Sequence, residues 1–210
     1  MENVLVAGAN GTTGKKIVNL LKASQYFNPV AMVRKEEQQE QFKKEGITTV
    51  LGDLEKDLFH TLEHIDKVIF AAGSGGKKVI AVDQEGAKNL MNASKKANIK
   101  KFVMLSSMGA DNPKASEDLQ EYLEAKLNAD EYLKSSGLTY SIVRPGSLTN
   151  DAGTGKIKLQ SKMNQQGSIT RDDVAQTLVR SLHDDAVINQ TIEIIQGETL
   201  IGEALDEVAV

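Results

Sequence analysis

The chain has 210 residues, of which 40% are apolar and 26% are charged, and it carries a net charge of −4. This length supports one domain with a full core, and the negative charge disfavours a nucleic-acid-binding protein, which needs a basic face. Because the chain has no cysteine, disulfides, thiolate metal sites and cysteine nucleophiles are excluded. It shows neither a secretory signal nor an apolar run of the ~18 residues that a membrane span needs, so we expect a cytoplasmic protein without membrane or nucleic-acid partners.

Apolar runs that predict buried strands alternate along the chain with runs of helical periodicity. The predicted strands are residues 3–8, 29–34, 47–53, 67–73, 100–107, 138–146 and 191–197, and the predicted helices are residues 13–24, 35–46, 79–98, 119–137 and 169–184, followed by a short terminal helix. This alternation predicts an α/β fold with a doubly wound, mostly parallel sheet that is covered on both faces. Residues 149–167 lack clear periodicity and form either a cover over a ligand site at the carboxyl edge of the sheet or a solvated loop.

Three glycines at a spacing of three, Gly8, Gly11 and Gly14, lie between the first strand and the first helix. In a phosphate-binding turn, the first glycine permits a sharp bend, the second lets the backbone approach a pyrophosphate, and the third lets helix and strand pack closely. The amides near Thr12 and Thr13 then lie at the positive end of the helix dipole, which stabilises a diphosphate. The alternative is a tight strand–helix turn that binds no ligand.

The end of the second predicted strand indicates which dinucleotide is bound. An acidic residue there binds the ribose 2′-hydroxyl of NAD, whereas this chain has Arg34 followed by Lys35. A guanidinium suits the 2′-phosphate of NADP, although Arg34 can also be a solvated cation. Asp53, after the third strand, is placed to reach an adenine or to cap a helix.

Tyr122 and Lys126 lie four residues apart on the helix after the fifth strand and therefore share one helical face. A lysine in that position can hold a nicotinamide ribose and assist proton transfer by the tyrosine beside a carbonyl. Ser106 and Ser107 end the fifth strand, where a hydroxyl can bind the same carbonyl oxygen. The alternative is a half-buried tyrosine beside a solvated lysine.

Other polar residues predict structure rather than chemistry. His60 and His64 have helical spacing, but no acidic cluster with a zinc pattern accompanies them, so we expect a solvated helix face and no metal site. Thr170 is a candidate N-cap, and we assign Asp172 and Asp173 a structural role in the first turn of that helix.

The segments "GANGTTG", "MVR", "GDL", "AAG", "VDQEGAKNL", "LSSMGA", "YLEAK", "SGLTYSIVRPG" and "ITRDDVA" follow one another along nearly the whole chain. With them the sequence resembles the atypical branch of the short-chain dehydrogenase/reductase family, near the NmrA-like and the biliverdin- and flavin-reductase-like groups. The resemblance implies a single NAD(P)-binding Rossmann domain over residues 1–210, with seven strands in the order 3-2-1-4-5-6-7 and a short substrate-side region from about residue 147 to 210.

The resemblance also implies which residues form the site. Ser107, Tyr122 and Lys126 match the catalytic serine, tyrosine and lysine of the family. The cofactor residues run from the phosphate turn through the adenine and the riboses to the nicotinamide, and they are Gly8, Asn10, Gly11, Thr12, Thr13, Gly14, Arg34, Asp53, Leu54, Ala71, Ala72, Gly73, Lys126, Pro145 and Gly146. The glycine spacing is looser than in the longer-known members, and the region after Arg144 is shorter than in the sugar-nucleotide epimerases.

These observations favour an oxidoreductase that prefers NADP(H) over NAD(H) and transfers a hydride to a small carbonyl, quinone or flavin-like acceptor. One alternative is a non-catalytic regulator that binds NADP(H) and whose partner senses the redox state; it needs Arg34 but neither Tyr122 nor Lys126. A further alternative is an epimerase or isomerase with a retained cofactor, against which the short carboxyl-terminal region argues. We expect a small-molecule substrate and a monomer or homodimer.

Overall fold

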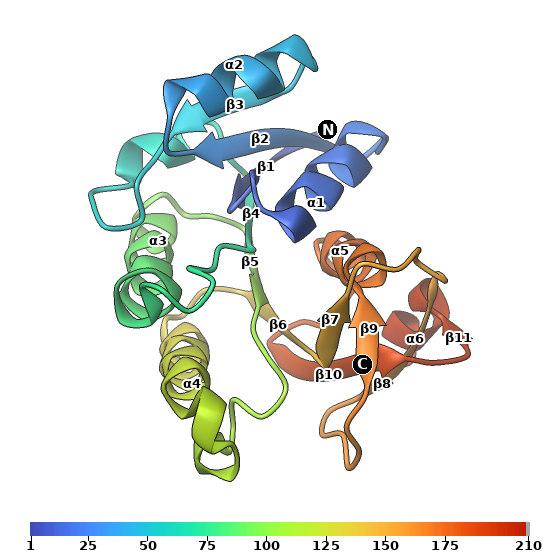
Figure 1. Ribbon diagram of the computed structural model, residues 1–210. Coiled ribbons are helices and arrows are strands. Elements are labelled where there is room, and N and C mark those ends of the chain that lie inside the picture. Colours follow the sequence, from blue (N-terminus) through green and yellow to red (C-terminus); the bar gives the residue numbers. More distant parts are fainter. Residues whose placement is uncertain (209–210) are drawn as a thin grey trace.

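The computed structural model of the protein describes residues 1–208 and contains a nine-stranded sheet of order β11-β8-β10-β6-β5-β4-β1-β2-β3 (Figure 1). Seven of these strands are parallel, and they take the predicted order. They are β1 (Glu2–Ala7), β2 (Phe27–Val33), β3 (Thr48–Leu51), β4 (Lys67–Phe70), β5 (Lys101–Leu105), β6 (Tyr140–Pro145) and β10 (Gln190–Gln196). The α/β, doubly wound prediction is therefore confirmed.

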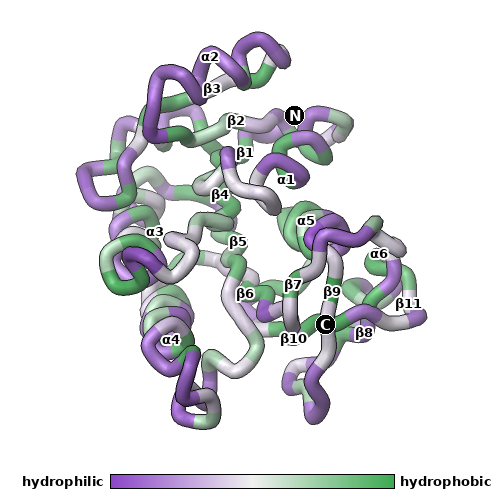
Figure 2. Tube along the Cα trace, viewed as in Figure 1, coloured by the Kyte–Doolittle hydropathy of each residue, from purple (hydrophilic) through white to green (hydrophobic). Residues whose placement is uncertain are grey.

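Helices cover both faces of this sheet, because alternate residues of each strand point to opposite sides. Val4 and Val6 of β1 pack in one core with α1 and α5, whereas Leu5 packs in a second core with α3 and α4. The apolar residues line these inner surfaces, as the hydropathy colouring shows (Figure 2). The helices are α1 (Thr12–Lys22), α2 (Glu36–Lys44), α3 (Ala87–Lys96), α4 (Gln120–Ser135), α5 (Arg171–Arg180) and α6 (Ile201–Asp206).

Two parts of the chain differ from the prediction. Residues 149–167, expected to lack regular structure, contain β8 (Lys156–Gln160), which pairs antiparallel with β10, and β11 (Thr199–Leu200) pairs with β8. The β8 sequence KIKLQ alternates polar and apolar residues, but this signal rests on only two apolar residues, Ile157 and Leu159, in a segment that is otherwise polar. β7 (Ser147–Thr149) and β9 (Ser168–Thr170) form a separate two-stranded sheet.

The predicted helix over residues 79–98 also differs, because only its second half is α-helical. Its first half is a π-helix, η2 (Val79–Gly86), and the remaining short helices are of the 3-10 type: η1 (Phe59–Leu62), η3 (Pro113–Ala115) and η4 (Glu117–Leu119). A π-turn widens the helix by one residue per turn and is frequent beside functional sites.

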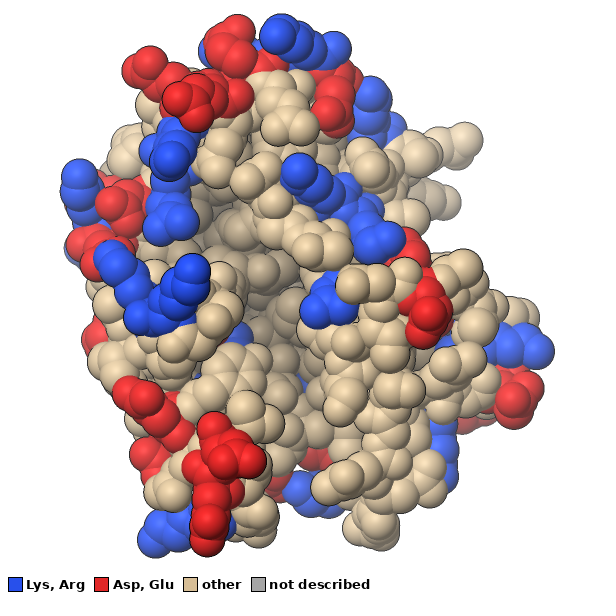
Figure 3. All heavy atoms as spheres, viewed as in Figure 1, with Lys and Arg blue, Asp and Glu red and all other residues tan. Residues whose placement is uncertain are grey.

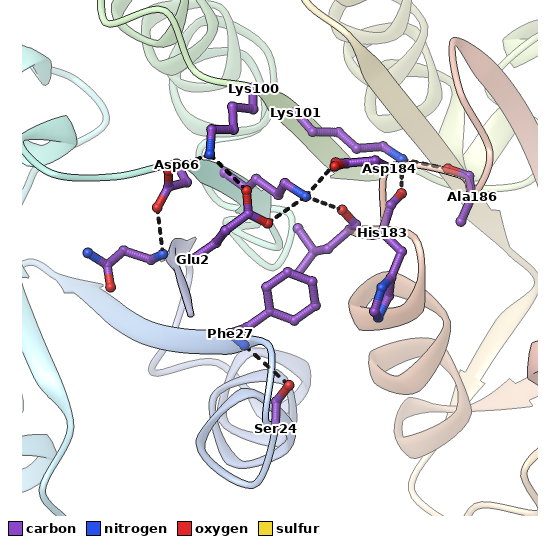
Figure 4. A network of polar contacts seen from close by, with 12 residues as sticks. Glu2, Ser24, Phe27, Asp66, Lys100, Lys101, His183, Asp184 and Ala186 are labelled. Carbon is purple, nitrogen blue, oxygen red and sulfur yellow. Dashed lines mark hydrogen bonds and ion pairs between the residues drawn. The ribbon is translucent and has the colours of Figure 1, made fainter.

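Two buried lysines lie at the end of the sheet at which the parallel strands begin, and Figure 4 labels one of them, Lys101, with its partners. Lys67 on β4 and Lys101 on β5 are neighbours in register. Lys67 Nζ pairs with Asp184 Oδ1 at 2.6 Å, and Lys101 Nζ donates to the carbonyl oxygens of His183 at 2.7 Å and Ala186 at 2.5 Å. These contacts fix the segment that follows α5 to this end of the sheet.

Within residues 1–208, no helix is both long and apolar enough to cross a bilayer.

Candidate functional site

The turn between β1 and α1 has the geometry that its glycines require. Gly8 adopts a φ of +87°, and the Gly11 amide donates to the Gly8 carbonyl oxygen at 2.9 Å. A Cβ on Gly14 would lie 2.0 Å from that oxygen, so only glycine lets α1 pack this closely. α1 begins at Thr12, and its amino end, which favours an anion, lies at the carboxyl edge of the sheet. The sharp turn and the close packing agree with the prediction, and the diphosphate itself stays a prediction.

A cavity of about 480 Å³ opens beside this turn, along the carboxyl ends of β1 to β4. The predicted residues that line it are Gly8, Asn10, Gly11, Arg34, Asp53, Leu54, Ala71, Ala72 and Gly73. Thr12, Thr13 and Gly14 form the first turn of α1 and do not line it. The prediction of cofactor residues missed Met32, Val33, Gln38, Gly52, Ser74, Lys77, Lys78 and Val82. Of these, Val33, Gly52 and Ser74 directly adjoin predicted residues in sequence.

Arg34 and Asp53 both line this first cavity. The Arg34 amide donates to Gln38 Oε1 at 3.2 Å, and within residues 1–208 no carboxylate comes within 4.0 Å of the guanidinium. The side chain is exposed and is therefore available to an anionic ligand. Asp53 Oδ1 accepts from the Glu55 amide at 3.1 Å in a turn, so the helix-cap alternative for Asp53 is wrong.

A second cavity, of about 720 Å³, lies beyond the ends of β5 and β6. Ser107, Tyr122, Pro145 and Gly146 of the predicted site line it, as do residues 162–167. The latter belong to the stretch predicted either to cover a site or to be solvated, and the structure supports the first alternative for this part. The space-filling view shows the hollowed face, with Lys and Arg around its upper part and Asp and Glu at its lower left (Figure 3).

Tyr122 and Lys126 share one face of α4, as predicted, but their surroundings differ. Tyr122 lines the second cavity, whereas Lys126 is only 3% exposed and lines neither cavity. The Lys126 Nζ atom lies 5.6 Å from the Tyr122 ring centroid, 3.4 Å from the Leu105 carbonyl oxygen and 3.5 Å from Asp83 Oδ1. The alternative of a solvated lysine is therefore wrong, and Ser107 Oγ, which donates to the Met108 carbonyl oxygen at 3.2 Å, is part-buried beside the same cavity.

Asp83 is another polar residue near the site that the sequence prediction missed. It lies in η2, is buried, and accepts from the Ser74 amide at 3.0 Å and the Ser74 hydroxyl at 2.7 Å. Ser74 lines the first cavity, so this group connects Lys126 to the cofactor side. The available signal was an aspartate directly after the apolar run "VIAV".

Ser106, the other candidate hydroxyl, has a structural role. Its Oγ donates to Asp130 Oδ2 at 2.8 Å, and the same oxygen accepts from Arg144 Nε at 2.9 Å. Burial raises the pKa of the Asp130 carboxyl, while the Arg144 charge acts in the opposite direction. Asp130 and Arg144 thus form a buried ion pair that holds Ser106. Of these two neighbouring serines, which both line the second cavity, Ser107 is the one whose hydroxyl has no side-chain partner among the described residues.

The predicted structural residues take structural positions. Thr170 caps α5 by accepting from the Asp173 amide, and Asp173 binds the amides of Thr154 and Gly155. His60 lies in a 3-10 helix and His64 has a φ of +59°, so the helical spacing predicted for them is absent. No group of three His, Asp or Glu side chains that could hold a metal occurs among the residues that the structure describes.

Comparisons with known proteins agree with this geometry. A family model described as NAD(P)H-binding matches residues 8–185. The chain is 39% identical over 210 residues to the uncharacterized sugar epimerase YhfK of Bacillus subtilis, with 96% of this chain and 98% of that one covered. It is 27% identical over 250 residues to sanguinarine reductase of Eschscholzia californica, with coverages of 96% and 91%.

A solved structure from Bacillus halodurans has the same fold over the whole chain. It superposes with a TM-score of 0.95 at 38% identity, covering 99% of this chain and 100% of that one, and it is described provisionally as an NAD-dependent epimerase/dehydratase.

Proposed function

The chain belongs to the NAD(P)H-binding family, and we propose that it is an NADPH-dependent reductase acting on a small carbonyl, quinone or flavin-like acceptor. The observation that supports this proposal is the second cavity, which Ser107 and Tyr122 line at the ends of β5 and β6, while the first cavity lies at the ends of the neighbouring strands β1 to β4. A regulator that only binds the dinucleotide needs the first cavity alone. The relative from Eschscholzia californica is named as a reductase, which supports the same proposal.

The residues of the first cavity fit a dinucleotide phosphate. At Gly8, a Cβ would lie 2.6 Å from the Ala72 amide nitrogen, so only glycine lets this turn pack against the end of β4 in the wall of the cavity. The amino end of α1 supplies backbone amides for a diphosphate. Arg34, which lines the cavity and is exposed, supplies a guanidinium for the 2′-phosphate, which is the basis of the proposed preference for NADPH.

When it is bound, the reduced nicotinamide supplies the hydride. Tyr122 then donates its proton to the acceptor's carbonyl oxygen, and Ser107 binds the same oxygen as negative charge develops on it. To do so the Ser107 hydroxyl rotates away from the Met108 carbonyl, which a hydroxyl does readily. The Lys126 ammonium, 5.6 Å from the Tyr122 ring, stabilises the phenolate that remains.

The test is Tyr122→Phe in an NADPH-oxidation assay with a panel of acceptors. We expect turnover to fall by about 100-fold or more, the contribution of a general acid, with NADPH affinity unchanged. Tyr132→Phe is the matched control, since Tyr132 lies on the same helix and its hydroxyl donates to Asn92 Oδ1 outside both cavities. Unchanged turnover in Tyr122→Phe would contradict the role of Tyr122.

The same assay separates the alternatives. A protein that oxidises NADPH with no acceptor of the panel, and that binds NADP⁺ and NADPH unequally, is a redox-sensing regulator. An epimerase converts its substrate without net oxidation of NADPH.

A further inference from the structure

The two cavities differ in formal charge. Among the residues lining the first, Arg34, Lys77 and Lys78 are cations and Asp53 is an anion, which gives +2. The residues lining the second include one cation, Lys162, and two carboxylates, which gives −1. The first cavity therefore attracts phosphates, and the second does not.

The rim of the second cavity adds further negative charge. Ser116 and Leu119 line its mouth, and the exposed side chains of Glu117, Asp118 and Glu121 flank them at the start of α4. Acidic side chains gather in this part of the hollowed face in the space-filling view (Figure 3).

Glu193 is the carboxylate at the base of the second cavity. It lies on β10, directly opposite Arg144 of β6 in the sheet register, and is 1% exposed. Its Oε2 accepts from the Met163 amide at 2.6 Å, whereas its Oε1 has no hydrogen-bond partner among the described residues. A buried carboxylate oxygen without a donor costs free energy, so Glu193 retains an unused acceptor at the wall of the cavity.

Lys162 places a positive charge next to Glu193 Oε1, the acceptor left free by the described residues. Its Nζ lies 3.6 Å from Glu193 Oε1 and pairs more closely with Asp111, and its side chain is 54% exposed. Lys162 lowers the pKa of the Asp111 carboxyl, and Asp111 raises the pKa of Lys162, so both stay charged at neutral pH. An exposed lysine with a closer partner elsewhere can give way to a ligand that donates a hydrogen bond to Oε1.

We infer that the second cavity binds acceptors that carry a hydrogen-bond donor or a positive charge, which Glu193 recognises, and that it rejects anionic acceptors. Apolar side chains, among them Leu119, Leu123 and Leu148, also line the second cavity and suit an acceptor whose remaining surface is apolar. The inference rests on the proposed function in taking this cavity as the acceptor site. A nucleotide sugar, with two phosphates, does not match this charge.

The test compares three ligands of one shape: benzamidinium, benzamide and benzoate. Each is titrated calorimetrically into the protein saturated with NADPH, at fixed salt and pH 7, and none of them is reduced by the cofactor. We expect benzamidinium to bind about tenfold or more tightly than benzoate, the ratio for one charge-assisted hydrogen bond, with benzamide between them. Equal binding of the three, or tighter binding of benzoate, would overturn the inference.

The variant Glu193→Gln tests whether Glu193 is the residue that causes the preference for benzamidinium. Glutamine keeps the size of the side chain and an oxygen for the Met163 amide, but it removes the charge, so the preference for benzamidinium over benzoate should fall about tenfold. Glu198→Gln, at a side chain that is 97% exposed, is the matched control and should keep the preference. A folded Glu193→Gln protein with an unchanged preference would overturn the assignment to Glu193; if this variant does not fold, the ligand series on the unmodified protein still decides.

These measurements do not depend on turnover. Absence of NADPH oxidation together with the expected binding order would refute the reductase proposal and leave this inference standing. Rapid reduction of carboxylate-bearing aldehydes in preference to their neutral counterparts would support the reductase and overturn the inference.

Discussion

Replacing Gly14 by alanine tests the close packing of the phosphate turn. The added Cβ would lie 2.0 Å from the Gly8 carbonyl oxygen and 2.9 Å from the Ala9 Cα, and both are backbone atoms. Because ordinary contact begins near 3.4 Å, the turn or the helix must move by more than about 1 Å. Such overpacking costs about 1–3 kcal/mol. Because backbone atoms cannot rotate out of the way, we expect a cost near the upper end of this range. Alanine in a helix is more favourable than glycine by about 0.5–1 kcal/mol, which offsets part of this cost. The free energy of unfolding should therefore fall by about 2 kcal/mol.

The assay is urea unfolding followed by circular dichroism, together with calorimetric titration of NADPH. Gly202→Ala is the matched control, since Gly202 also lies in a helix, α6, and its added Cβ meets no atom within 4 Å. That variant should gain up to about 1 kcal/mol. Gly14→Ala should also bind NADPH more weakly, because the displaced turn carries the amides. A Gly14→Ala protein with unchanged stability and unchanged NADPH affinity would refute the packing argument.

Three further expectations concern charged side chains. Asp83→Asn leaves the buried Lys126 without its counter-charge, so the free energy of unfolding in urea should fall by about 3 kcal/mol, whereas Asp57→Asn, at an exposed site, should not change it. Arg34→Ala should weaken NADPH binding by about 1–3 kcal/mol and spare NADH binding in calorimetry; equal losses for both cofactors would refute the 2′-phosphate assignment. Burial lowers the pKa of Lys101 to about 8 from 10.5, so the unfolded chain holds this proton more tightly than the folded one. The free energy of unfolding should therefore rise between pH 8 and 10.5 relative to that of Lys101→Met. A pH-independent difference between the two proteins would contradict this.

Local patterns in the sequence were sufficient for most of the fold. The seven parallel strands follow from apolar runs and the helices from their period, because both signals lie within a few neighbouring residues. The turn at Gly8 and the cap at Thr170 were also predictable, since each depends on backbone geometry next to the residue itself. β8 and the π-helical segment before α3 were missed, because the pairing of β8 with β10 and the widened turn are decided by packing against other elements.

The candidate site, like the fold, was predictable from the sequence only in part. The sequence by itself determined that a glycine turn, Arg34 and Tyr122 come in the order of a dinucleotide-binding reductase. Only the tertiary structure decided that Lys126 is buried against Asp83 and that Glu193 lies at the second cavity, with one oxygen that accepts no hydrogen bond from residues 1–208. The physical reason is that each of these contacts joins side chains from separate elements. The charge and burial of such a group depend on which elements the folded sheet brings together.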